Sequence, residues 1–120
     1  MIKERLLELP DLIVEKKQEL LTLQEQLADL HEDMSKWELV QINEINNAID
    51  DKGKPLYSND AKRKAELEKR KQVDERYTKW ANDTKELNRY IARKNIVLER
   101  LYNTQSNLRA ICRLEGNGNE

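Results

Sequence analysis

In the second half of the chain, core-type residues follow one another at alternate spacings of three and four. They are Val73, Tyr77, Trp80, Thr84, Leu87, Ile91, Lys94, Leu98, Leu101, Gln105, Leu108 and Cys112. This 3.5-residue period allows one helix to pack along another over its whole length. A matching series runs through the first half, with Ile13, Lys16, Leu20, Leu23, Leu27, Leu30, Met34, Trp37 and Gln41. The two series, called the seam below, predict two long amphipathic helices.

The two halves of the chain carry opposite charge. Residues 1–50 hold 5 Lys or Arg and 12 Asp or Glu, a net charge of −7, whereas residues 60–114 hold 15 and 8, a net charge of +7. An acidic helix and a basic helix in one chain favour pairing with each other over pairing with their own copies. We therefore predict an all-α fold, a long antiparallel two-helix coiled-coil hairpin.

Turn and capping residues set the expected boundaries. Pro10 is a favoured first helical residue, Asp50 to Pro55 are turn-forming, Ser58 to Asp60 are good N-caps, and Gly116 is a natural helix stop. We expect one hairpin domain over residues 1–114, with helices at about 10–49 and 59–114, a loop at about 50–58 and a disordered tail at 115–120.

The register of the hairpin follows from the position of the loop. With a turn centred near residue 54 or 55, the numbers of opposed residues sum to about 109. Trp37 then faces Val73, and Leu23 faces Leu87. Apolar positions meet apolar positions in this register. The polar seam residues Lys16 and Lys94 are expected to fix register and oligomeric state.

Additional apolar residues gather at the end away from the loop. One hairpin leaves one side of its seam exposed, so we expect two copies to form a four-helix bundle there. The residues predicted at this oligomer interface are Leu7, Val14, Leu21, Tyr90, Val97, Leu101, Leu108 and Ile111.

The densest charge cluster runs from Lys62 to Gln72. It is interpreted either as a basic tip that contacts a partner or as a solvated helix with i,i+4 pairs such as Glu66 with Arg70. As a partner-binding surface it comprises Lys54, Tyr57, Lys62, Arg63, Lys69 and Arg70, with Tyr57 exposed in the loop.

The residues offer no chemistry for catalysis. His31 is the only histidine and Cys112 the only cysteine, so a structural zinc site and an internal disulfide are not expected. The sequence has no Gly-rich phosphate loop and no nucleophile with a plausible base. We expect a non-enzymatic protein with no metal and no cofactor. The charged start of the chain and the lack of a long apolar run predict a cytoplasmic protein with no membrane partner.

The segment Tyr57-Ser58-Asn59-Asp60-Ala61-Lys62-Arg63-Lys64-Ala65-Glu66-Leu67, followed by a long charged helix, resembles small uncharacterised proteins carried by phages and prophages of low-GC Gram-positive bacteria. The likeness covers about residues 55–105. It implies a phage accessory role in the host cytoplasm and supplies no active site.

Two functions follow as hypotheses. In the first, the protein is a non-catalytic binder that modulates a host defence or nuclease enzyme, or a phage recombination or replication partner. In the second, the basic start of the second helix binds nucleic acid. Neutralisation of that helix by the acidic one weighs against the second hypothesis.

Overall fold

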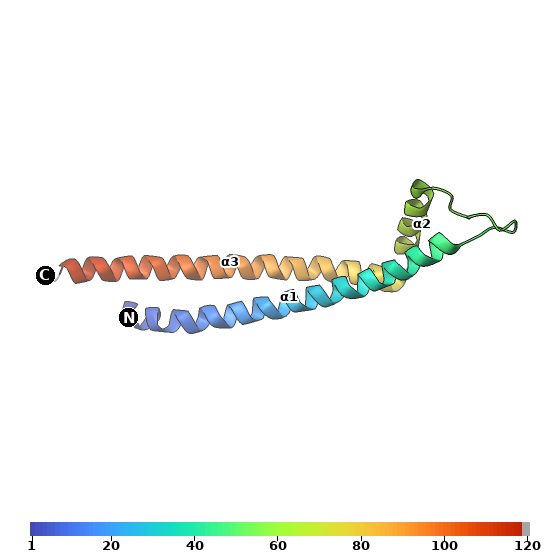
Figure 1. Cartoon of the computed structure of the whole chain (residues 1–120). Coiled ribbons are helices and arrows are strands. Elements are labelled where there is room, and N and C mark those ends of the chain that lie inside the picture. Colours follow the sequence, from blue (N-terminus) through green and yellow to red (C-terminus); the bar gives the residue numbers. More distant parts are fainter. Residues whose placement is uncertain (119–120) are drawn as a thin grey trace. The chain divides into compact units, whose positions relative to one another are not determined.

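The computed structural model describes residues 1–118, and all of its elements are α-helices (Figure 1). They are α1 (Ile2–Asn47), α2 (Asp60–Val73) and α3 (Glu75–Gly118). The only strand-like feature within this range is an isolated bridge between Ile49 and Pro55. The predicted all-α class is therefore confirmed. No helix in the described part of the chain combines the length and apolar character needed to cross a membrane.

Helix α1 begins eight residues earlier than the sequence suggested. It starts at Ile2 and contains Pro10, which was expected to be its first residue. Proline leaves the carbonyl of Leu6 without its helical donor. The helix continues through this position because Leu9 and Ile13, on either side of the proline, are both buried. Their burial offsets the missing hydrogen bond.

The single helix expected over residues 59–114 is interrupted at Asp74. This residue is extended, with φ −81° and ψ 119°, and its amide donates to the Arg70 carbonyl at the end of α2. Its carboxylate accepts from the amide of Tyr77 at 2.9 Å, which caps the start of α3. Helix α3 then extends to Gly118, so residues 115–118 are helical where a disordered tail was expected, and residues 119–120 lie outside the described range.

The connection between α1 and α2 covers residues 48–59. The Asp50 carboxylate accepts from the amides of Lys52 and Lys54, both at 2.9 Å. Between them Gly53 has a φ of +77°, which favours glycine. The Asn59 side chain accepts from the Lys62 amide and caps α2. Local hydrogen bonds thus set both ends of this connection.

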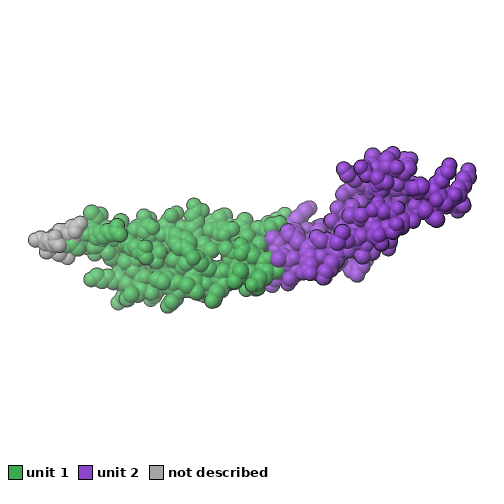
Figure 2. Space-filling view, viewed as in Figure 1, with its two compact units in different colours: residues 1–25, 87–120 green, residues 26–86 purple. Residues whose placement is uncertain are grey.

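The chain divides into two compact units, coloured separately in Figure 2. Unit 1 comprises residues 1–25 and the part of α3 from residue 87 onward. Its two helical segments are antiparallel, because Lys17 lies over the ring of Tyr102 and Glu19 accepts from Lys94. The buried residues of unit 1 are Leu9, Ile13 and Leu98. Lys94, expected to interrupt the seam, is thus paired by an acidic residue of α1.

Unit 2 comprises residues 26–86. Its buried residues are Trp37 and Ile45, and Trp37 packs on Tyr77 with ring centroids 4.7 Å apart. The expected partner of Trp37 was Val73, which is instead 73% exposed. The observed partner, Tyr77, lies about one helical turn beyond the expected partner, Val73. This difference arises because Asp74 ends α2 immediately after Val73, so the helix that faces Trp37 begins only at Glu75.

The seam residues themselves follow the predicted pattern closely. Apart from Val73, every member of the two seam series is buried or half-buried. Leu9 also belongs to the seam and was not recognised from the sequence, because Pro10 placed it outside the expected helix.

Candidate protein-interaction surface

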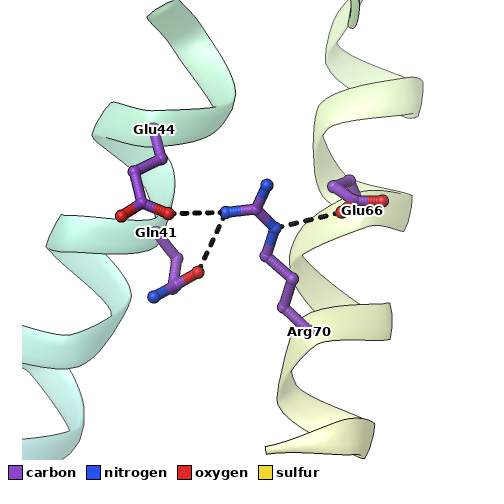
Figure 3. A network of polar contacts seen from close by, with 4 residues as sticks. All are labelled: Gln41, Glu44, Glu66 and Arg70. Atoms are coloured by element: carbon purple, nitrogen blue, oxygen red, sulfur yellow. Dashed lines mark hydrogen bonds and ion pairs between the residues drawn. The ribbon is translucent and has the colours of Figure 1, made fainter. Parts of the chain in front are cut away.

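Arg70 holds α2 against α1 within unit 2. Its Nη1 donates to Gln41 and to Glu44, each at 2.9 Å, and its Nε donates to Glu66 at 3.0 Å (Figure 3). The hydrogen bond from Arg70 lowers the pKa of Glu66, and Glu66 in turn raises the pKa of Arg70. Since α2 has no buried residue, polar contacts of this kind contribute to its attachment. Arg70 was predicted to bind a partner, and in the structure it is paired with Glu44 and Glu66.

A second polar cluster joins α1 to the start of α3 and the end of α2. Glu38 accepts from the Tyr77 hydroxyl at 2.7 Å, and the Lys71 ammonium lies 3.2 Å from the same carboxylate oxygen. Burial acts to raise the pKa of Glu38, but the hydrogen bonds from Tyr77 and Lys71 outweigh it and lower the pKa overall. The carboxylate form of Glu38 is therefore favoured in the folded protein.

We expect this carboxylate to contribute to the acid sensitivity of unit 2. Because the folded-state pKa of Glu38 is lowered, its stabilising effect is present above the ordinary glutamate pKa of about 4.3 and is lost as the pH falls through the lower folded value. In Glu38→Gln, the free energy of unfolding should therefore fall less steeply between neutral pH and about pH 3. Urea titrations followed by circular dichroism at several pH values measure this slope.

Glu25→Gln is the control for that measurement. Glu25 is exposed and takes no part in the ion pairs of the described residues. Its variant should keep the slope of the wild type. Identical slopes for Glu38→Gln and the wild type would contradict the assigned role of Glu38.

The other predicted contact residues fall into two groups. Tyr57, Lys62 and Arg63 lie together at the start of α2, where Arg63 pairs with Asp60 and donates to the Tyr57 carbonyl at 3.3 Å. The Arg63 hydrogen bond lowers the pKa of Asp60. Tyr57 is half-buried rather than exposed as expected, and its backbone carbonyl accepts the hydrogen bond from Arg63.

Lys54 and Lys69 form the second group. Both are exposed, Lys54 in the connection and Lys69 on α2. Lys64, which was not among the predicted contacts, is also exposed. Within the described residues none of these three lysines takes part in an ion pair. The unpaired positive charge of α2 therefore comes from its lysines, since its arginines are paired with carboxylates.

An apolar groove opens beside Lys64, between the end of α1 and α2. Its volume is about 630 Å³. It is lined by Ile42, Ile45, Asn46, Asp60, Arg63, Lys64 and Leu67. Among these residues Ile45 is buried, Ile42 is exposed and Leu67 is half-buried. The groove thus combines apolar side chains with a charged edge.

Sequence reasoning did not predict this groove. Ile42 and Ile45 are out of step with Gln41 in the seam, and that phase shift is the signal that could have marked them. Leu67 is the one large apolar residue in the middle of α2. Ile42 and Ile45 of α1 and Leu67 of α2 are thus out of register with the seam and line the same groove.

The residues predicted at the oligomer interface all belong to unit 1. Six of them are exposed: Leu7, Val14, Leu21, Tyr90, Val97 and Ile111. The other two, Leu101 and Leu108, are half-buried at seam positions. They are therefore less available to a second copy than the other six.

The described residues contain no cluster of three or more His, Cys, Asp or Glu side chains that could hold a metal ion. His31 is exposed, and Cys112 is half-buried with its thiol free. Comparison of the chain with protein-family models, curated proteins and solved structures found no match.

Proposed function

We propose that the protein is a non-catalytic protein-protein interaction module. The observation that carries this proposal is the groove of Ile42, Ile45 and Leu67, with Lys64 at its edge. Protein interfaces commonly have an apolar centre, which supplies affinity, and a polar rim, which fixes orientation. The groove and its charged edge have this composition.

The resemblance to small phage and prophage proteins suggests the biological setting. We propose an accessory role in the host cytoplasm, in which the protein binds and modulates a host defence or nuclease enzyme, or a phage recombination or replication partner. A helical protein can inhibit an enzyme by filling a groove or by bridging subunits. This role requires neither catalysis nor a cofactor.

We also propose that α1 and α3 form one antiparallel coiled-coil hairpin, and that copies of this hairpin associate through unit 1. The antiparallel contacts inside each unit and the exposed apolar residues of unit 1 support this arrangement. A dimer with four helices side by side is the smallest such assembly.

Affinity capture from lysate of the host, treated with nuclease, tests the binding function. We expect the wild type to retain a specific protein. Leu67→Glu should retain at least tenfold less, because a carboxylate in the apolar groove is poorly solvated. Bound protein is measured by quantitative mass spectrometry.

Val73→Glu is the matched control, since it places the same charge at an exposed position of α2. It should retain the partner as the wild type does. Equal retention by Leu67→Glu and Val73→Glu, with helical content intact, would show that the groove is not the binding surface.

Nucleic-acid binding is the second candidate, and the exposed Lys62, Lys64 and Lys69 on α2 favour it. The pairing of Arg63, Arg70 and Lys71 with carboxylates weighs against it, because these charges are already neutralised. In the capture experiment this function predicts that nuclease treatment removes the retained material. It also predicts a steep loss of binding with added salt.

A further inference from the structure

An exposed apolar stripe runs along α1 in unit 1. It consists of Leu7, Val14 and Leu21, which recur every seven residues and are 52–78% exposed. Residues seven apart lie on nearly the same side of a helix, after two turns. We call these three residues the α1 stripe. They do not belong to the seam, so the contact with α3 does not cover them.

A second stripe runs along α3 in the same unit. Tyr90, Val97 and Ile111 lie at the same seven-residue phase and are 36–50% exposed. We call them the α3 stripe. Three large side chains in each stripe leave two apolar surfaces of unit 1 in contact with water. Apolar surface arranged in this way is typical of helices that pack against a further helix.

Two contacts show which flank of unit 1 carries the α1 stripe. Lys17 lies 5.3 Å from the ring centre of Tyr102, so both residues mark one flank of the helix pair. Val14 and Leu21 are the i−3 and i+4 neighbours of Lys17 on the helix surface. The α1 stripe therefore lies on the flank of Lys17 and Tyr102.

The α3 stripe lies on the other flank. Tyr90 and Val97 are i−4 and i+3 neighbours of Lys94, which donates to Glu19. On α3, Val97 is about 140° around the helix from Tyr102. On α1, Glu19 is likewise about 160° from Lys17. The two stripes of one copy therefore face in roughly opposite directions.

The charges beside the stripes are complementary. Around Val14 and Leu21, the acidic neighbours Asp11 and Glu25 outnumber the basic Lys17. The charged surface neighbours of Val97 are all basic: Arg93, Lys94 and Arg100. Over the whole unit, residues 2–25 hold 4 Lys or Arg and 6 Asp or Glu, whereas residues 87–118 hold 6 and 2. An α1 stripe thus suits an α3 stripe, while two α3 stripes in contact would bring arginines together.

We propose that the α1 stripe of one copy packs against the α3 stripe of a second copy. This inference rests on the self-association proposed above and specifies its contact. The two surfaces are different, so the contact is heterologous. Because the stripes lie on opposite flanks, two copies leave one stripe of each kind uncovered, and further copies can add.

Two double variants test the pairing. Val14→Glu with Leu21→Glu inactivates the α1 stripe, and Tyr90→Glu with Val97→Glu inactivates the α3 stripe. Glutamate is a good helix former at exposed positions, so helical content should be retained in both. Sedimentation equilibrium should show the wild type growing beyond a dimer with concentration. Each variant alone should remain at the 14.3 kDa of one chain.

An equimolar mixture of the two variants decides the question. Each variant keeps the stripe that the other lacks, so the mixture should form a 1:1 dimer that does not grow further. A contact between identical surfaces gives no such complementation. As the control, Asn103→Glu with Ala110→Glu adds the same charge at exposed positions away from both stripes and should assemble like the wild type.

The possible failures are distinguishable. If the wild type associates but the mixed variants remain monomeric, the heterologous contact is wrong and self-association stands. A wild type that stops at a dimer likewise overturns the heterologous contact. If the wild type is monomeric at every concentration, the proposed self-association fails as well, while the capture experiment on the groove still tests the binding function.

Discussion

Replacing Trp37 with alanine is expected to reduce the free energy of unfolding of unit 2 by about 3–4 kcal/mol. Trp37 is only 8% exposed and is one of two buried residues in this unit. Its removal leaves a cavity and also ends the contact with the Tyr77 ring. A contact between aromatic rings contributes about 1 kcal/mol beyond the area it buries.

Urea unfolding followed by far-ultraviolet circular dichroism measures this loss. Val40→Ala is the control, because Val40 is a nearby apolar residue of α1 that is exposed. Its variant should change the free energy of unfolding by no more than about 0.5 kcal/mol. A loss of under about 1 kcal/mol for Trp37→Ala would contradict the packing described for unit 2.

Leu9→Asp is expected to unfold unit 1, or to reduce its stability by at least about 4 kcal/mol. Leu9 is 2% exposed and is one of the three buried residues of unit 1, with Ile13 and Leu98. An aspartate at this position would lose its hydration without gaining a partner. The proline that follows already removes one helical hydrogen bond, so this part of α1 has little stability in reserve.

Hydrogen exchange measured by mass spectrometry locates the effect. Protection should be lost at residues 2–25 and in α3 beyond residue 87, and largely kept in unit 2, if the two units open separately. Leu39→Asp is the control, because Leu39 lies on the same helix outside both stripes and is 65% exposed. Leu39→Asp should preserve protection throughout. Comparable losses in the two variants would show that Leu9 is not a core residue.

The seam could be predicted because a 3.5-residue period depends only on which residues are apolar. Of the two seam series, only Val73 proved exposed. The break at Asp74 could not be found in this way, since a heptad pattern continues through a cap when the helices on both sides keep similar phase. A local signal for the break exists, because aspartate is favoured at N-caps and the acidic Glu75 follows Asp74. The heptad pattern, however, indicates one continuous helix.

The interaction surface was predicted only in part. The composition of α2 indicated a basic surface, but it did not show that Arg63 and Arg70 are paired with carboxylates. The pairing of Arg70 with Glu44 depends on how α2 crosses α1, and no helical spacing contains that information. The groove depends on the same crossing. It could not be inferred before the positions of Ile42 and Leu67 in space were known.

The cap at Asp74 also separates the folding of two helices. The unwinding of a helix spreads from its ends one residue at a time, and a new helix must form its own first turn. Asp74 stabilises the first turn of α3, because its carboxylate accepts a hydrogen bond from the Tyr77 amide. Because α2 also has no buried side chain, its unfolding need not spread into α3.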